Sequence, residues 1–383
     1  MVQVYMVQKV KVIIGAGSVY NLSDILVGMK RENPLIVCDQ GIVGSGIFDV
    51  VADILKASRL DYAAFSEVLA DPPDELAAKG YETYLRNHCD CVVGLGGGSA
   101  IDTAKAINIL CYNEGPILRY AKGGNMKPSP GLIVIPTTSG TGSEMSDGLV
   151  ITSGKTKFPI LADQAMSEYA ILDPELTKSM PPMLTAVTGF DALAHVVEAY
   201  TSTAANALTD MICEKVMMTI KEWLPKAVKD GTNLEAREKM MIASCMGGFM
   251  LTQAHSNAGH SLAHIVGGYF KMPHGYCCAY ALPYIVEFNA KALPDKTRWI
   301  ASCFDKEVAE DASYAVIGFA AKDGLISFRD KTLGMRKSSE WDIDSERFDE
   351  MARDIITEPF QTFNPVKMEE EDAVKLLKAI LSE

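Results

Sequence analysis

The first half of the chain alternates short apolar runs with segments of helical periodicity, and this alternation constrains the fold more than any other feature. The apolar runs are PLIVCD (34–39), CVVGLGGGS (91–99) and GLIVIPTTSGTGSE (131–144), and helical patterns occupy 48–58 and 101–110. Apolar runs separated by helices are typical of a parallel sheet covered by helices on both faces. The sequence therefore predicts an α/β domain with a parallel sheet in this half.

The second half has a different character. Helical patterns bounded by glycine, such as 207–224 and 234–251, dominate there, and clear strand patterns vanish. The two prolines of the segment 180–183 disfavour a continuous helix through the junction. With 383 residues, 48% of them hydrophobic, the chain is long enough for two domains. We predict an α/β domain over 1–180 and an all-helical domain over 181–383.

Charge and composition exclude several classes of protein. The net charge is −13 and no basic run is present, whereas nucleic-acid binding needs clustered Lys and Arg. No apolar stretch approaches the length that spans a bilayer, and the N-terminus lacks a signal-peptide pattern. The nine cysteines show no CxxC spacing, so a zinc knuckle or a disulfide framework is not expected. We expect a cytoplasmic protein that acts on a small molecule, without nucleic-acid or membrane partners.

A glycine-rich loop follows the second apolar run. Gly96, Gly97 and Gly98 have no Cβ atom, so a phosphate can approach their backbone closely. Ser99 is a favourable N-cap residue, and the helix predicted after it directs its positive end at the same place. The pattern is typical of a pyrophosphate site, although a tight strand-to-helix turn without a ligand also produces it.

Polar residues follow the neighbouring runs as well. Asp39 ends the first run, where its carboxylate either accepts hydrogen bonds from a ribose diol or is an ordinary solvated loop acid. Thr138 and Thr141 lie among hydroxyl residues after the third run, which suits a phosphate, a ribose or a plain loop. Upstream, Gly15-x-Gly17 lacks the third glycine of a dinucleotide fingerprint, and we predict only a turn there.

Five of the six histidines lie between 195 and 274. Asp191 and His195 are four residues apart and so share one face of a predicted helix, as do His260 and His264, and His274 follows in a Pro-His-Gly loop. The first pair alone also fits an ion pair. The whole group predicts a site for a divalent cation, and one carboxylate with three imidazoles suits Fe²⁺ or Zn²⁺ better than Mg²⁺ or Ca²⁺.

Four segments together resemble the signatures of the iron-containing (group III) alcohol dehydrogenases. They are GGGSAIDTAK, PTTSGTGSE, TGFDALAH and GHSLAHIVGGYFKMPHG, and the resemblance runs in collinear order from about residue 10 to about residue 290. It implies a dehydroquinate-synthase-like fold, with a dinucleotide-binding α/β domain, a helical metal-binding domain and an active site between them. It also implies NAD as cofactor, Fe²⁺ with Zn²⁺ as an alternative, and a homodimer or larger homo-oligomer.

The resemblance also implies residue roles. His264 would lie near the nicotinamide as a catalytic residue, and the metal ligands would be Asp191, His195, His260 and His274. The cofactor would be bound by Asp39 at the adenosine ribose, by the pyrophosphate-binding Gly97, Gly98 and Ser99, and by Asp102, Thr138, Thr141 and Lys157 along the rest of the groove. A carboxylate at the ribose repels a 2′-phosphate, so we expect NAD and not NADP.

The chain departs from the family pattern near the expected substrate. Leu251, Gln253 and His255 precede the third predicted ligand, and the last two are more polar than the family norm. They favour an alcohol or aldehyde with a polar or anionic group, such as sulfoacetaldehyde, although His255 equally fits a helix-end histidine. Asp71 stands where the family usually has Asn. The alternative is a lyase of the dehydroquinate synthase type, which is disfavoured because Lys271 is the only basic residue of the near-metal segments apart from histidine.

Overall fold

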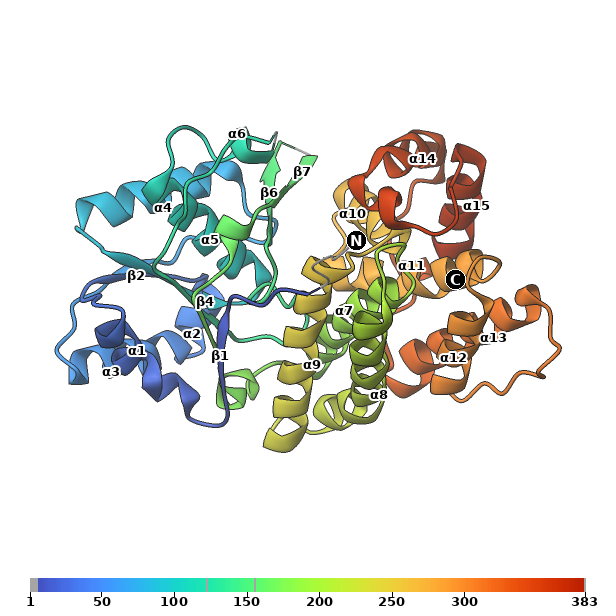
Figure 1. The fold of residues 1–383 in the computed structure, drawn as a ribbon, viewed down its shortest axis with the longest axis horizontal. Helices are drawn as coiled ribbons and strands as arrows, with labels where there is room; N and C mark the ends of the chain where they lie inside the picture. The colour runs from blue at the N-terminus through green and yellow to red at the C-terminus, as the bar shows by residue number, and fades with distance from the viewer. Residues whose placement is uncertain (1–5, 122, 155, 382–383) are drawn as a thin grey trace, which may run out of the picture. The chain divides into compact units, whose positions relative to one another are not determined.

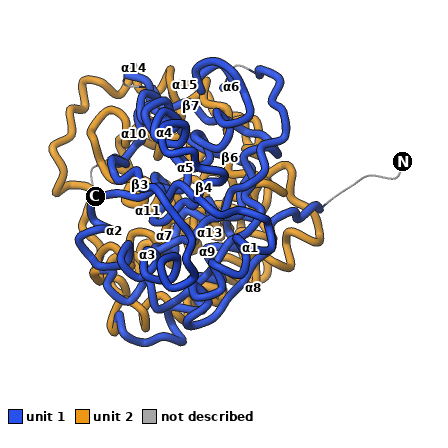
Figure 2. The backbone as a smooth tube through the Cα atoms, turned by 90° about the vertical axis from the view of Figure 1, so that its left-hand side faces the viewer, with its two compact units in different colours: residues 1–180, 231–249 blue, residues 181–230, 250–383 orange. Residues whose placement is uncertain are grey.

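The computed structural model describes residues 6–121, 123–154 and 156–381, and the chain forms two compact units (Figure 2). The first unit consists of Met1–Met180 and Gly231–Phe249, and the second of Pro181–Asp230 and Met250–Glu383. Segment 231–249 thus belongs to the first unit, although it lies inside the predicted helical domain 181–383. The reason is backbone contact: a Cβ atom on Gly248 would lie only 1.8 Å from the carbonyl oxygen of Gly142. We propose, as the sequence predicts, that the domain boundary lies between residues 180 and 181.

The first unit is built on a six-stranded parallel sheet with the strand order β1-β8-β5-β4-β2-β3. Figure 1 labels β1, β2 and β4 of this sheet. The strands are β1 (Lys11–Ile14), β2 (Pro34–Val37), β3 (Ala63–Phe65), β4 (Cys91–Gly96), β5 (Leu132–Pro136) and β8 (Tyr169–Leu172). All residues of β2, β4 and β5 are buried, because these strands are covered on both faces. The predicted parallel sheet is confirmed.

Helices cover the sheet, and successive residues of a strand face different helices. The helices are α1 (Leu22–Gly28), α2 (Gln40–Gly44), α3 (Ile47–Ala57), α4 (Asp74–Arg86), α5 (Gly98–Tyr112) and α6 (Leu118–Ala121). Val93 and Leu95 of β4 join a core cluster with α1 and α3. Gly94, between them, faces α5, since its Cβ atom would lie 2.8 Å from that of Ala104. Glycine is needed at this position for α5 to approach the sheet.

The helix α5 is buried between the sheet and a hairpin that the sequence did not reveal. The antiparallel strands β6 (Gly148–Ser153) and β7 (Thr156–Leu161) contribute Leu149, Ile151 and Ile160 to a cluster with the apolar residues of α5. A helix that is apolar around most of its circumference is one covered on several sides. The sequence did not show β7 as a strand because Pro159 interrupts its pattern.

The second unit contains helices and no strand among its described residues, which confirms the helical prediction for this part of the chain. Its helices are α7 (Pro182–Tyr200), α8 (Ala207–Lys229), α10 (Ala258–Phe270), α11 (His274–Asn289), α12 (Pro294–Cys303), α13 (Tyr314–Ser327), α14 (Phe348–Thr357) and α15 (Glu370–Leu381), while α9 (Leu234–Gln253) runs through both units. Pro182 occupies the first turn of α7, where its missing N–H costs nothing. Among the described residues, no helix is both long and apolar enough to cross a membrane.

Candidate active site

The strand order brings the predicted cofactor residues to one edge of the sheet. β4 lies between β2 and β5, so the segments that follow these three parallel strands meet at their carboxyl ends. The chain leaves β2 toward β3 on one side and then crosses to β4 on the other, which is the switch point where open α/β sheets bind ligands. The structure brings together Asp39, the glycine loop and the two threonines; their binding of a cofactor stays a prediction.

The glycine loop has no room for side chains. A Cβ atom on Gly98 would lie 2.7 Å from Cγ2 of Thr141, and one on Gly97 would lie 3.3 Å from Oγ1 of Thr138. The predicted N-cap was wrong: Gly97 caps α5, no side chain bonds to the cap, and Ser99 lies in the first helical turn. Gly97 has no side chain that could cap the 15-residue helix, and the positive end of such a helix suits an anionic group.

Asp39 has two roles that its position in the sequence could not separate. One oxygen, Oδ1, accepts a hydrogen bond of 3.0 Å from the backbone N–H of Ile42 and so caps α2. The other, Oδ2, lies 3.7 Å from where a Cβ atom on Gly96 would be. The carboxylate is thus a helix cap that also borders the glycine loop.

Asp102 and Lys157 are both engaged with protein groups. Asp102 accepts hydrogen bonds from the Ser143 hydroxyl at 2.6 Å and from the Val150 N–H at 3.0 Å, so it joins α5 to the loop after β5 and to the hairpin. Burial raises the pKa of Asp102 above its ordinary value and outweighs the opposing charge and hydrogen bonds. Lys157 pairs with Asp71 at 2.7 Å. Their contact with a cofactor stays a prediction.

The upstream Gly15-x-Gly17 segment is the predicted turn. β1 ends at Ile14, and the Asp173 carboxylate accepts hydrogen bonds of 3.1 Å from the N–H groups of Gly17 and Val19. A protein carboxylate thus takes the place that a phosphate would need at this loop.

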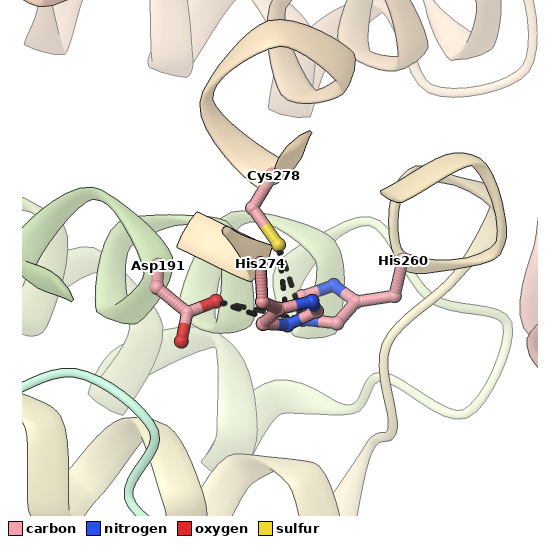
Figure 3. Close-up of side chains that lie close together, drawn as sticks. All are labelled: Asp191, His260, His274 and Cys278. Atoms are coloured by element: carbon pink, nitrogen blue, oxygen red, sulfur yellow. Dashed lines mark hydrogen bonds and ion pairs between the residues drawn. The ribbon is translucent and has the colours of Figure 1, made fainter. Parts of the chain in front are cut away.

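In the second unit, three imidazoles surround one carboxylate oxygen. Asp191 and His195 lie on α7, His260 on α10, and His274 at the start of α11. The Nε2 atoms of His195, His260 and His274 lie 3.7, 3.8 and 3.5 Å from the same Oδ1 atom of Asp191. Figure 3 shows Asp191, His260 and His274 converging on one point. The structure brings the four predicted ligands together, and their role as ligands stays a prediction.

The geometry and charge of this group fit a divalent cation. The Oδ1 atom of Asp191 is buried and accepts no hydrogen bond from any described residue. Burial by itself raises the pKa of Asp191, but the imidazoles of His195, His274 and His260 outweigh it and hold that pKa below its ordinary value. The N–O separations exceed ordinary hydrogen-bond lengths, and donor atoms about 2.1 Å from a tetrahedral ion are about 3.4 Å apart. The donor atoms of Asp191, His260 and His274 also lie within 4.8 Å of one another, so these three are spaced for a shared ion, while His195 is placed only by its 3.7 Å contact with Asp191.

Glu198, which the sequence reasoning missed, orients His260. Its Oε1 lies 2.7 Å from Nδ1 of His260, and its Oε2 accepts hydrogen bonds from the N–H groups of Asn257 at 2.9 Å and His260 at 3.0 Å. A carboxylate only accepts, so Nδ1 carries the proton and Nε2 presents its lone pair toward Asp191. Burial lowers the pKa of His260, but the hydrogen bond and charge of Glu198, together with the charges of Asp191 and Glu358, outweigh it, and the net shift is upward. The i+3 spacing from His195 on α7 was the available signal.

Glu358 holds His264 in the same manner. Its Oε1 lies 2.7 Å from Nδ1 of His264, and the ring of His264 has its centroid 5.3 Å from that of His274. Burial raises the pKa of Glu358, but the hydrogen bond and charge of His264, the Phe360 N–H and the charge of His260 together outweigh it, and the net shift is downward. The two partners are 94 residues apart, so no local pattern could have paired them.

The predicted substrate residues lie at and just after the end of α9. Leu251 and Gln253 are in its last turn. His255 follows with a φ of 61°, donates its backbone N–H to the Met250 carbonyl and stacks on Phe363 with ring centroids 4.1 Å apart. This left-handed position ends the helix, as the helix-end interpretation of His255 requires. Contact with a substrate stays a prediction for all three.

Known proteins match this chain along nearly its whole length. Residues 9–174 match the family model described as Iron-containing alcohol dehydrogenase, and residues 185–381 match the Fe-containing alcohol dehydrogenase family, C-terminal. The NAD-dependent methanol dehydrogenase of Bacillus methanolicus is 32% identical over 375 residues, which are 96% of this chain and 97% of that relative.

Solved structures agree with these matches. A crystal structure of 1,3-propanediol oxidoreductase has a TM-score of 0.92 at 29% identity and covers 99% of this chain and 100% of its own. Sulfoacetaldehyde reductase from Bifidobacterium kashiwanohense, solved in complex with NAD⁺, has a TM-score of 0.87 at 28% identity and covers 98% of each chain. The expected enzyme class is confirmed, and the chain belongs to the iron-containing alcohol dehydrogenase family.

Proposed function

We propose that this alcohol dehydrogenase transfers a hydride between NAD(H) and a primary alcohol or its aldehyde, and that its preferred substrates carry a polar or anionic group. The observation that carries the proposal is the buried Oδ1 of Asp191, which lies among three imidazole nitrogens and accepts no hydrogen bond from the described residues. The family is named for iron, and relatives are named as NAD-dependent methanol dehydrogenase and as sulfoacetaldehyde reductase with NAD⁺.

The contacts of these residues support a role for each. Asp191, His195, His260 and His274 would hold the metal, which when bound polarises a substrate oxygen as a Lewis acid while NAD exchanges the hydride. The Nδ1–H group of His264 donates a hydrogen bond to Glu358, so Nε2 is the ring atom that can accept or return a proton. The carboxylate partner fixes the ring, and a fixed ring is what proton transfer needs.

In the first unit, the edge formed after β2, β4 and β5 would bind the dinucleotide. The uncapped N-terminus of α5 suits the pyrophosphate, and the absence of Cβ atoms at Gly97 and Gly98 lets it approach the backbone. The Oδ2 atom of Asp39 borders the glycine loop, and this supports NAD as the cofactor. A 2′-phosphate beside a carboxylate would cost about 2–4 kcal/mol of binding free energy. The polar side chain of Gln253 supports polar substrates.

The experiment is a panel of aldehydes with NADH, on protein stripped by a chelator and reloaded with Fe²⁺ or Zn²⁺. We expect NADH loss that is stoichiometric with the aldehyde and that depends on the metal. Product formation without net NADH loss would indicate the lyase, and full activity in a metal-free preparation would refute the metal centre. Replacement Asp191→Asn is the matched control, because it keeps the side-chain shape and removes the charge that holds the ion.

Substrate preference has its own comparison. We expect a higher kcat/KM for aldehydes with a polar or anionic group than for butanal, and Gln253→Leu should narrow the difference. A wild type with a higher kcat/KM for butanal than for every polar aldehyde would contradict the proposed substrate class while leaving the enzyme class intact.

A further inference from the structure

A thiol lies among the predicted metal ligands. Cys278 is on α11, four residues after His274, so both side chains lie on the same side of the helix. Its Sγ atom lies 3.4 Å from Nε2 of His274 and 3.8 Å from Nε2 of His260. One donor atom from each of Asp191, His260, His274 and Cys278 forms a group in which all atoms lie within 4.8 Å of one another (Figure 3).

These separations match a metal site that includes sulfur. A tetrahedral ion with bonds of about 2.1 Å to nitrogen and about 2.3 Å to sulfur places the two atoms about 3.6 Å apart. The observed S–N separations of 3.4 and 3.8 Å lie on either side of that value. The Oδ1 atom of Asp191 is buried and accepts no hydrogen bond from the described residues, which also points to an ion.

The neighbouring cysteine shows what a thiol outside the group does. Cys277 is equally buried, and its Sγ contacts the backbone carbonyl of Met272 at 3.8 Å. The Sγ atom of Cys278 instead lies beside the imidazole nitrogens of His260 and His274 and within 4.8 Å of the Asp191 carboxylate. The two adjacent residues thus form a matched pair, with one thiol at the centre and one packed elsewhere.

We infer that the thiolate of Cys278 is a ligand of the metal at this centre, together with Asp191, His260 and His274. The inference rests on the proposed metal centre. On binding, the Sγ–H proton passes to water and the sulfur donates an electron pair to the ion. His195, whose Nε2 lies 3.7 Å from Oδ1 of Asp191, is not among these four donor atoms and would be a fifth donor. The softer sulfur should shift selectivity toward Zn²⁺ and Co²⁺ and away from Mn²⁺.

Cobalt spectroscopy tests this assignment without measuring activity. Full-length protein stripped of metal is titrated anaerobically with Co²⁺ under reducing conditions. The bound metal is counted by inductively coupled plasma mass spectrometry. We expect one Co²⁺ per chain and a thiolate-to-cobalt charge-transfer band in the near ultraviolet for the wild type and for Cys277→Ala. The band should be missing from Cys278→Ala and from Cys278→Ser, which serves as the second variant if the smaller side chain harms folding.

A competition titration adds a second readout. The Zn²⁺ affinity of Cys278→Ala should fall by at least about tenfold. Even the replacement of a residue that only hydrogen-bonds to a ligand lowers metal affinity about 10- to 100-fold. Its Mn²⁺ affinity should fall less, and equal losses for both metals would contradict the assignment. A wild type that holds one Co²⁺ without the band, or a band that survives in both Cys278 variants, would overturn the inference alone. A folded wild type that binds no Co²⁺ would overturn the proposed metal centre with it.

Discussion

Replacement Glu198→Gln should weaken both the helical unit and its metal centre, although the side chain keeps its shape. The carboxylate is 1% exposed and accepts three hydrogen bonds, from Nδ1 of His260 and from the backbone N–H groups of Asn257 and His260. Glutamine has one acceptor oxygen in place of two. If that oxygen keeps the backbone bonds, the amide NH₂ group faces Nδ1 of His260, and two donors meet.

The magnitude follows from these contacts. Hydrogen bonds to a charged acceptor contribute about 1.5–3 kcal/mol each and neutral ones about 0.5–1.5, so neutralising the acceptor should cost about 2–4 kcal/mol of unfolding free energy in total. The donor clash is relieved when the ring of His260 moves its proton from Nδ1 to Nε2. That tautomer has no lone pair toward Asp191, so metal affinity should fall by about 10- to 100-fold.

Two measurements check this reasoning. Urea denaturation of metal-free protein gives the change in midpoint, and a competitive Zn²⁺ titration gives the change in affinity. Glu287→Gln is the control, because Glu287 pairs with Lys322 at 2.6 Å and the side chains are 33% and 19% exposed. Such a pair contributes at most about 1 kcal/mol. A Glu198→Gln protein with wild-type midpoint and wild-type Zn²⁺ affinity would refute the proposed orientation of His260.

Three further predictions concern other residues. His264→Ala should keep the metal and lower kcat by roughly 100-fold, because it removes the proton-accepting ring; loss of the metal would make His264 a ligand instead. Asp39→Gly should relax a wild-type preference for NAD over NADP of about 100-fold, measured as kcat/KM for both, while the lost cap costs only a few tenths of a kcal/mol; a wild type that prefers NADPH would contradict this. Burial raises the pKa of Glu144 from 4.5 to about 7, so the folded state holds a proton that the unfolded chain releases. The stability from that proton is complete below pH 4.5 and is lost as the pH rises through about 7, and Glu144→Gln should flatten this decline in the urea midpoint; an unchanged slope would assign it to another group.

The sequence by itself determined the features that depend on local periodicity. The spacing of Asp191 and His195 on α7 and the apolar runs of β2, β4 and β5 needed no knowledge of neighbours, since side-chain direction repeats with the helix or strand. It failed locally at Ser99, because N-cap preference favours serine over glycine, whereas the close approach of Thr138 and Thr141 leaves the cap to Gly97.

Only the tertiary structure decided which of these local features meet. The strand order places Asp39 beside the glycine loop, and packing of α7, α10 and α11 turns three imidazoles and the thiol of Cys278 toward one oxygen of Asp191. Glu358 contacts His264 although the two are 94 residues apart, and nothing in the sequence distinguishes Glu358 from an exposed acidic residue. A periodic pattern fixes which face of an element is buried, but the neighbour of that face is fixed by the packing of the whole chain, where contacts far apart in sequence are chosen together.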